Sequence, residues 1–335
     1  MKDISIVKKG KIPDKVKQKG SLITMKMTFW NCGIKANRSN RLEYSYKILD
    51  AVNSIFISKE SDVVFMCEVD KEFTECPSVI GYLNEKKIDL IDACDEVKSR
   101  VKFDICAIYN PENISVELDK YIVYNNLDDE QEHTGNNIKV GVIFHLKNKK
   151  NIESSCVAVI VSHWPSKLTP GYEFRHKEAA EKLRDTAHEL IKQGLQVVLI
   201  GDYNLSPDEI IKNTPLQSYN NKFFATRSNL RLYNLGFHFL EQHSISCRKI
   251  NLPLEHAHGF GTFISSSNRA VETGCATFDY AHVGSSLIKD GPWIIDEEAT
   301  RIFANQVIID MIYGNTSHLD HLPIIVSLME KNNDQ

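Results

Sequence analysis

Short apolar runs of strand length recur along this chain and alternate with stretches of helical periodicity. Continuously apolar runs are typical of strands covered on both faces, because a strand with one solvated face alternates apolar and polar residues. Two stretches, 46–57 and 173–193, repeat apolar side chains at helical spacing and predict helices. The strand-like runs are 27–32, 62–67, 103–109, 116–124, 140–146, 156–161, 196–200, 278–283 and 322–328. This alternation predicts an α/β fold with helices packed on the sheets.

The chain shows no internal linker that would divide it into separate domains. Residues 25–330 are therefore predicted to form a single domain with two similar halves. Residues 1–24 are rich in lysine and contain glycine and proline breakers, and they predict a flexible basic leader. Residues 205–260 are polar and less regular, and they predict a variable insertion over one end of the sheet.

Charge is distributed unevenly along the sequence. The whole chain has 40 basic and 44 acidic side chains, a formal net charge of −4. Residues 1–26 contain eight lysines against two aspartates, so this segment carries +6 and the remainder carries −10. A protein that binds polyanions through bulk charge is excluded, whereas a local basic strip is not.

Cysteine usage and hydropathy indicate a soluble protein of a reducing compartment, the cytoplasm. Eight cysteines are present, without a C-x-x-C pair, and four of them lie in or beside apolar runs where a free thiol behaves as a small hydrophobe: Cys32, Cys67, Cys106 and Cys156. The longest apolar runs fall well short of the roughly 20 residues that a membrane-spanning helix needs. The lysine-rich start also lacks the apolar segment of a signal peptide, so no membrane contact is expected.

Five apolar runs lie directly beside polar residues that can bind a metal or move a proton. These residues are Asn31, Glu68, His163, Asp202 with Asn204, and Asp320 with His321. A turn bond at Asn31, an ordinary satisfied histidine at His163 and a helix cap at Asp202 are the simpler alternatives. Loops at strand ends bring sequence-distant residues together in α/β folds. Five such positions in one chain therefore indicate a site.

Taken together, these residues resemble the motifs of the endonuclease/exonuclease/phosphatase superfamily, in the order of that family and over residues 27–328. The resemblance implies a four-layer α/β sandwich with two central, mostly antiparallel β-sheets flanked by helices. It also implies a divalent metal, usually Mg²⁺, with Mn²⁺ possible. The matching segments are Asn31, Glu68, 162–166 (SHWPS), 201–204 (GDYN), 278–280 (FDY) and 320–323 (DHLP).

The resemblance implies a role for each matching residue at the metal. Glu68 corresponds to the principal metal ligand, and Asn31 and Asp320 correspond to positions near the metal. Mg²⁺ suits this set, because it is a hard ion held by few carboxylates together with water and phosphate oxygens.

The resemblance also implies roles in catalysis. Asp202 corresponds to the residue that orients or deprotonates the attacking water, and Asn204 to one that holds the phosphate. His321 would be oriented by Asp279 in a His–Asp pair, and His163 would donate a proton or bind phosphate. Which histidine acts as acid and which as base stays open.

Substrate contacts are predicted around the SHWPS segment. Trp164, Lys167 and Arg175 are candidates to line a phosphate-bearing groove, and the alternative for Trp164 is packing against the helix that begins near residue 173. Basic residues are needed there because phosphate neutralisation supplies most non-specific affinity for nucleic acid. The candidates are Lys35, Arg38, Arg41, Lys139, Lys167 and Arg175.

The sequence thus predicts a Mg²⁺-dependent phosphodiester hydrolase, most simply a nuclease that acts on DNA in preference to RNA. Water would attack the phosphorus in line, with the metal and a His–Asp pair assisting. Two alternatives stay open. One is a phosphomonoesterase or lipid-type phosphodiesterase of the same fold, and the other is a catalytically silent scaffold.

Overall fold

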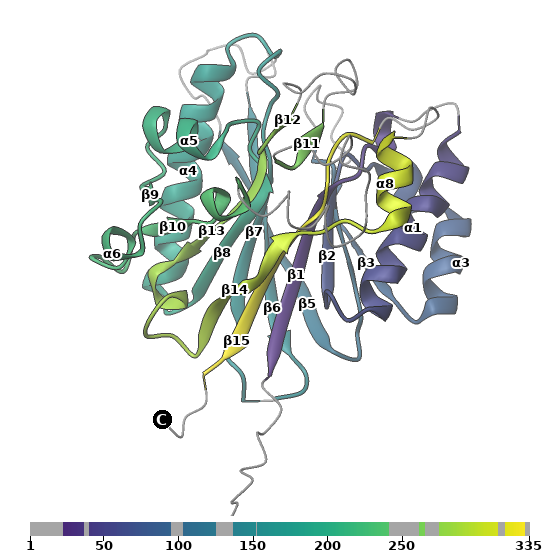
Figure 1. The fold of residues 1–335 in the computed structure, drawn as a ribbon, viewed down its shortest axis with the longest axis horizontal. Helices are drawn as coiled ribbons and strands as arrows, with labels where there is room; N and C mark the ends of the chain where they lie inside the picture. The colour runs from purple at the N-terminus through teal and green to yellow at the C-terminus, as the bar shows by residue number, and fades with distance from the viewer. Residues whose placement is uncertain are drawn as a thin grey trace, which may run out of the picture.

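Two β-sheets flanked by helices make up the computed structural model of this protein (Figure 1). Figure 1 shows α1, α3 and α8 on one side of the pair of sheets and α4 and α5 on the other. The structure describes residues 23–36, 40–94, 103–124, 137–151, 153–240, 261–264, 275–313 and 319–331. The predicted α/β sandwich is confirmed.

The first sheet has six strands in the order β14-β15-β1-β2-β4-β3. Its only parallel pair is β1 with β2, so the sheet is mostly antiparallel. The first and last strands of the sequence, β1 and β15, lie side by side near its centre. The bounds are β1 Thr24–Asn31, β2 Val63–Cys67, β3 Asp89–Asp92, β4 Ile105–Tyr109, β14 Trp293–Ile302 and β15 Ile324–Glu330.

The second sheet has seven strands in the order β5-β6-β7-β8-β13-β10-β9. The pairs β7 with β8 and β9 with β10 are parallel, and the others are antiparallel. A short separate pair is formed by β11 (Phe263–Ile264) and β12 (Cys275–Ala276). The bounds are β5 Ile114–Tyr124, β6 Ile138–Asn148, β7 Val157–His163, β8 Gln196–Asp202, β9 Ser218–Tyr219, β10 Leu232–Asn234 and β13 Asp279–Gly284.

The helices cover the outer faces of the sheets. The two predicted helices correspond to α1 (Arg41–Ile57) and α4 (Tyr172–Lys192), and α4 packs on β5, β6 and β8. Ser206 caps α5 (Pro207–Asn213) through a reciprocal capping box with Glu209, which sets where this helix begins. The other helices are η1 Ile34–Ala36, α2 Lys71–Thr74, α3 Pro77–Lys86, α6 Lys222–Ala225, η4 Ser285–Leu287 and α8 Gln306–Tyr313.

The core lies where the two sheets face each other. Every residue of β2 and of β8 is buried, as their apolar sequences require. The rings of Phe65 in β2 and Phe144 in β6 meet across the interface with centroids 5.1 Å apart. The two sheets therefore pack directly on one another (Figure 1). As a result, the ends of strands from both sheets lie near each other at the same end of the sandwich.

Several elements of the fold were not predicted, among them α3, β3 and α8. β14 was missed, because its alternating burial leaves acidic residues on the solvated face and conceals the apolar period. The last two predicted strands, 278–283 and 322–328, are therefore not consecutive, since β14 lies between β13 and β15. Within 205–260, β9 and β10 extend the second sheet, and residues 241–260 lie outside the described residues. Residues 1–22 of the predicted leader also lie outside them.

The cysteines that the structure describes in full are all free thiols: Cys32, Cys67, Cys76, Cys94, Cys106 and Cys156. Among the described residues, none of the helices has both the length and the apolar character needed to cross a membrane. A cytoplasmic location stays a prediction.

Candidate functional site

The predicted site residues lie at one end of the sandwich because strand direction and register place them there. Asn31 is opposite Cys67 at the ends of the parallel strands β1 and β2, and Glu68 follows directly. His163 is opposite Asp202 at the ends of β7 and β8. Asp279 begins the antiparallel strand β13 opposite Asp202, so it reaches the same edge from the other direction.

Asn31 connects the two sheets at this end. Its buried amide Nδ2 lies 3.3 Å from Glu68 Oε1 and 3.1 Å from Asp202 Oδ2. The second oxygen of the Asp202 carboxylate, Oδ1, accepts the backbone N–H of Asn204 at 2.9 Å. Both oxygens of Asp202 are therefore held in place, and its carboxylate orientation is set by groups from both sheets.

Two of the predicted residues have a left-handed backbone. The φ angles are 57° at Glu68 and 51° at Asn204. Residues other than glycine adopt this region at a cost of about 1–3 kcal/mol, and such strain concentrates at functional sites. The Asn204 side chain donates from Nδ2 to the Trp164 carbonyl at 2.9 Å, so it braces the SHWPS loop in this structure.

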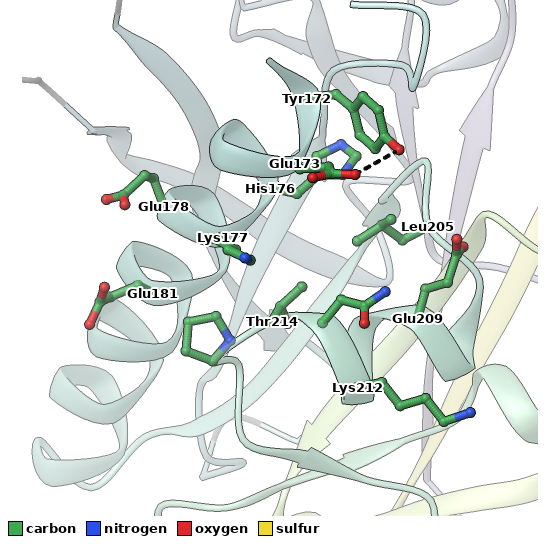
Figure 2. A pocket seen from close by; sticks show the side chains of 12 residues that line it. Tyr172, Glu173, His176, Lys177, Glu178, Glu181, Leu205, Glu209, Lys212 and Thr214 are labelled. Atoms are coloured by element: carbon green, nitrogen blue, oxygen red, sulfur yellow. Dashed lines mark hydrogen bonds between the residues drawn. The ribbon is translucent and has the colours of Figure 1, made fainter.

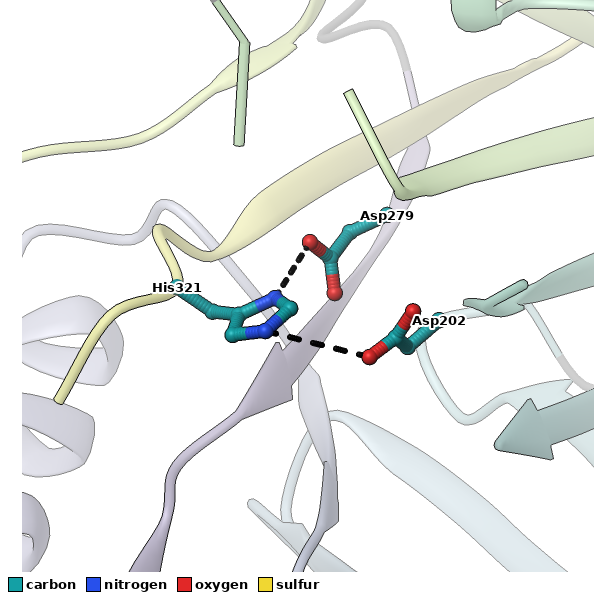
Figure 3. Close-up of side chains that lie close together, drawn as sticks. All are labelled: Asp202, Asp279 and His321. Carbon is teal, nitrogen blue, oxygen red and sulfur yellow. Dashed lines mark hydrogen bonds and ion pairs between the residues drawn. The ribbon is translucent and has the colours of Figure 1, made fainter. Parts of the chain in front are cut away.

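His321 lies between two aspartates (Figure 3). Its Nδ1 is 2.7 Å from Asp279 Oδ2, and its Nε2 is 3.8 Å from Asp202 Oδ2. Burial by itself would lower the pKa of this imidazole, but the attraction and hydrogen bond of Asp279, together with attraction to Asp202 and Asp320, outweigh it and raise the pKa to about 10. The His321 carbonyl accepts the indole N–H of Trp30 at 3.0 Å, which ties this loop to β1.

His163 forms a second His–Asp pair, with Asp104. The His163 Nδ1 lies 3.1 Å from Asp104 Oδ1, and Lys35 Nζ lies 3.6 Å from Asp104 Oδ2. Burial opposes charge on the imidazole, but the attraction and hydrogen bond of Asp104, together with attraction to Asp202 and Glu68, prevail and raise the pKa of His163 to about 9. The pKa of Asp104 is lowered despite its burial, because His163 and Lys35 favour the carboxylate.

Asp104 is the site residue that sequence reasoning missed. It was included in the predicted strand 103–109 and not considered further, although it immediately precedes the apolar strand β4. Because β4 runs antiparallel to β2, with Ile105 opposite Cys67, the start of β4 lies at the same edge as the end of β2. The sequence did contain a signal for Asp104, namely a carboxylate directly beside an apolar run. That signal indicates a site residue when the carboxylate precedes a strand as well as when it follows one.

Oxygen donors suited to a hard dication are concentrated at this end of the sheets. Burial raises the pKa of Asp320; attraction to His321 offsets part of that rise, and repulsion from Glu68 adds to it. Such an excess of carboxylates is what a divalent cation would neutralise, and Glu68, Asp320 and the amide oxygen of Asn31 are the oxygen donors that Mg²⁺ favours.

A second group of possible ligands comprises Asp202, Asp279 and His321, whose ligand atoms lie within 4.8 Å of one another. In this group the Nδ1 of His321 is already engaged by Asp279. The all-oxygen set fits the metal better, and the assignment of Glu68, Asn31 and Asp320 as ligands stays a prediction.

The three predicted substrate contacts have different surroundings. Trp164 is fully buried, its Nε1 donates to the Val140 carbonyl, and its ring packs on Tyr203 and on His176 of α4. Trp164 thus packs on α4, as the alternative describes, and it also lines the pocket that contains Glu68 and His163, so its role as a substrate contact stays a prediction. Lys167 Nζ pairs with Glu209 at 2.6 Å.

Arg175, the third predicted contact, is one of the residues that line a pocket beside the site, and its contact with substrate stays a prediction. It lines a pocket of about 370 Å³ together with Glu68, Asp104 and His163. Of the other basic candidates, Lys35 and Lys139 line the same pocket. Arg41 pairs with Asp70 and Glu72, and Arg38 lies outside the described residues.

A larger pocket of about 860 Å³ lies between α4 and α5 (Figure 2). It contains none of the predicted site residues. Four glutamates line it, against two lysines: Glu173, Glu178, Glu181 and Glu209, with Lys177 and Lys212. This pocket is therefore poorly suited to an anion, whereas the smaller pocket contains the predicted site residues Glu68 and His163.

Comparison with known proteins gives structural relatives only. No protein-family model matches the chain, and no curated protein matches it in sequence. Humanized D. rerio TDP2 is 15% identical with a TM-score of 0.53, over 91% of this chain and 98% of that one. The human Nocturnin catalytic domain with bound sulfate is 14% identical with a TM-score of 0.52, over 92% and 94%. ANGEL2, a 2′,3′-cyclic phosphatase solved with adenosine-2′,3′-vanadate, is 11% identical with a TM-score of 0.55, over 92% and 96%.

Proposed function

Because the chain has the fold of the endonuclease/exonuclease/phosphatase superfamily, we propose that it is a divalent-metal-dependent phosphodiester hydrolase acting on nucleic acid. One observation carries the proposal. Asn31 of the first sheet contacts Asp202 of the second, and one buried and one partly exposed His–Asp pair lie at the same end of the sandwich. Fold alone would not imply catalysis, but this arrangement supplies the groups that hydrolysis of a phosphodiester requires.

Glu68, Asn31 and Asp320 are the proposed ligands of the metal, Mg²⁺ or Mn²⁺. A bound dication supplies positive charge to the phosphate oxygens and to the oxygen that leaves. Burial raises the pKa of Asp320, repulsion from Glu68 adds to that rise, and a dication would favour the ionised carboxylate against both.

Asp202 is the proposed residue that orients the attacking water. Its carboxylate is buried and fixed through both oxygens, so it can hold a water in one direction at little further entropic cost. His321, fixed by Asp279, and His163, fixed by Asp104, are the proposed proton-transfer and phosphate-binding groups. Asn204 is the proposed phosphate contact. To bind phosphate, its side-chain amide must break the hydrogen bond that it donates to the Trp164 carbonyl in this structure.

DNA is the proposed substrate. D. rerio TDP2, which is 14% identical with a TM-score of 0.52, was solved with a single-strand DNA product. A second candidate is a cyclic or terminal phosphate ester, favoured by the similarity to ANGEL2. A silent scaffold is disfavoured, because a scaffold has no need for two His–Asp pairs at one end of the sandwich.

The test is turnover of plasmid, single-stranded DNA, RNA and phosphomonoesters, each with Mg²⁺ or EDTA, by wild type and Asp202→Asn. We expect cleavage of polynucleotide with Mg²⁺ alone and a loss of at least 100-fold in kcat for Asp202→Asn, the usual scale for a residue that activates water. Turnover that persists in EDTA, or a variant as active as wild type, contradicts the mechanism. Phosphate release from monoesters without polymer cleavage favours the second candidate.

A further inference from the structure

A surface formed by α6 and the last two strands of the second sheet, β10 and β9, has no part in the proposed chemistry. Figure 1 shows α6 at the left edge of the view, beside these strands. Two neighbouring phenylalanines of α6 are exposed here, Phe223 at 63% and Phe224 at 46%, with their ring centres 5.6 Å apart. Adjacent exposed rings make this surface a candidate for contact with another molecule.

The segment that forms this surface is basic, in a protein whose net charge is −4. Residues 210–240 contain no aspartate or glutamate. Both lysines of this stretch pair with carboxylates from elsewhere, whereas among the described residues no carboxylate pairs with Arg227 or Arg231. The two arginines can therefore attract an anion. The four cations of the stretch are Lys212, Lys222, Arg227 and Arg231.

Aromatic rings position both of these guanidinium groups. The Arg227 Cζ lies 5.1 Å from the centre of the Phe223 ring, and the Arg231 Cζ lies 4.8 Å from the centre of the Tyr219 ring. Arg231 Nη1 also donates to the Phe224 carbonyl at 3.0 Å. An aromatic ring orients a guanidinium without neutralising its charge. The surface therefore presents two oriented cations beside aromatic rings.

The register of the second sheet separates this surface from the candidate site. Tyr219 in β9 is opposite Tyr233 in β10, and Tyr233 is opposite Val283 in β13. Val283 is four residues from Asp279 along β13. At about 3.4 Å per residue and about 4.8 Å between strands, Tyr219 and Asp279 are separated by roughly 15–20 Å. A ligand that reaches both places must therefore be a chain and not a small molecule.

We propose that Phe223, Phe224, Arg227 and Arg231 bind a single-stranded segment of nucleic acid outside the catalytic pocket. Surfaces that bind single strands combine aromatic rings, on which unpaired bases stack, with cations that attract the phosphates. The absence of any acidic residue over 210–240 favours a polyanion over a protein as the occupant. This inference rests on the proposed function for the class of ligand, and it adds a surface that contacts the strand away from the bond that is cleaved.

The test uses the full-length protein and the variants Phe223→Ala and Arg227→Gln. Binding of a fluorescent single-stranded oligodeoxynucleotide, and of a duplex of the same sequence, is measured by anisotropy in EDTA over a range of salt concentrations. Both replaced side chains are exposed, so neither substitution should disturb the fold, and the thermal unfolding midpoint checks this. The matched control is Phe174→Ala/Lys177→Gln, which removes an exposed ring and a nearby exposed cation from α4.

We expect Phe223→Ala to weaken binding of the single strand about tenfold without changing the salt dependence, because stacking releases no counterions. Arg227→Gln should make the slope of log affinity against log salt shallower by about 0.7, as for one lost phosphate contact on a single strand. The bases of a duplex are already paired, so Phe223→Ala should change duplex affinity by less than about twofold. With Mg²⁺, the loss in kcat/KM on the oligonucleotide should exceed the loss on bis(4-nitrophenyl) phosphate by about tenfold.

Single-strand affinity of Phe223→Ala equal to that of wild type overturns the proposed surface, and so do equal losses in Phe223→Ala and the control. A loss of duplex affinity as large as the loss of single-strand affinity also overturns it. If wild type cleaves no polynucleotide and the affinity difference persists, the proposed function fails while the single-strand surface stands. If wild type cleaves DNA and Phe223→Ala binds and cleaves it equally well, the surface fails while the proposed function stands.

Discussion

Two histidines at the candidate site each depend on one buried carboxylate. His163 pairs with Asp104 and His321 with Asp279, and in both cases the partner raises the imidazole pKa against the effect of burial. Sequence reasoning identified both histidines and Asp279 but not Asp104. The reason is physical: a carboxylate beside a strand has many ordinary uses, and only the register of β4 against β2 places this one beside His163.

Replacing Asp104 with asparagine tests the His163 pair at the residue scale. The folded pKa of about 9 lies above the ordinary 6.5, so the pair's contribution to stability is fully present below pH 6.5 and is lost as pH rises through 9. In Asp104→Asn the carboxylate attraction is gone and burial lowers the pKa. We expect the alkaline limb of the kcat/KM profile to move to lower pH by at least one unit, with the His163 titration seen by NMR moving in parallel.

Asp208→Asn is the matched control for this substitution, because it removes an exposed carboxylate that pairs with Lys212 on α5. Its pH profile should coincide with that of wild type. An Asp104→Asn profile that also coincides with wild type would show that His163 protonation does not govern turnover.

At the scale of elements, the parallel pair β7 and β8 sets the spacing of the site. Gly201 lies next to Asp202, and a Cβ at Gly201 would lie 2.2 Å from the Ser162 carbonyl oxygen. The neighbour is backbone and cannot rotate away, so any side chain here must push β7 and β8 apart. The site therefore depends on glycine at this position, independently of any chemistry at Asp202.

Gly201→Ala is accordingly expected to destabilise the protein by about 1–3 kcal/mol, the usual cost of overpacking, and to lower kcat by displacing Asp202 from His163. Urea unfolding gives the first quantity and initial rates the second. Gly81→Ala is the control, because nothing lies within 4 Å of its Cβ position in α3 and alanine favours a helix by about 1 kcal/mol over glycine. A Gly201→Ala protein as stable as wild type would refute the close approach of the strands.

At the scale of the whole molecule, the candidate site exists only because the two sheets face each other. Trp30 and Asn31 of the first sheet hold the His321 carbonyl and the Asp202 carboxylate. The packing of Phe65 on Phe144 maintains the spacing between the sheets from the core. The geometry of the site therefore depends on the same packing between the two sheets that forms the core.

Phe65→Ala tests this coupling. Removal of a fully buried ring typically costs about 3–5 kcal/mol, and here the loss falls at the interface of the sheets. We expect that loss in the free energy of urea unfolding, together with inactivation at a lower temperature. Phe174→Ala removes a half-exposed ring from α4 and should change stability by less than about 1 kcal/mol. If the two variants lost similar amounts of unfolding free energy, the packing of Phe65 between the sheets would not contribute more to stability than an exposed ring does.

The amino-acid sequence by itself determined the α/β class, the positions of the long strands other than β14, the helices α1 and α4, and the identity of most of the candidate site residues. Hydrophobic periodicity and the polar residue at the end of an apolar run are local properties, and both can be read without coordinates. Only the tertiary structure decided which of these residues meet, since register and sheet packing are long-range properties. It brought Asp104 to His163, buried Trp164 against α4, engaged Lys167 with Glu209, and left Arg175 in the pocket with Lys139.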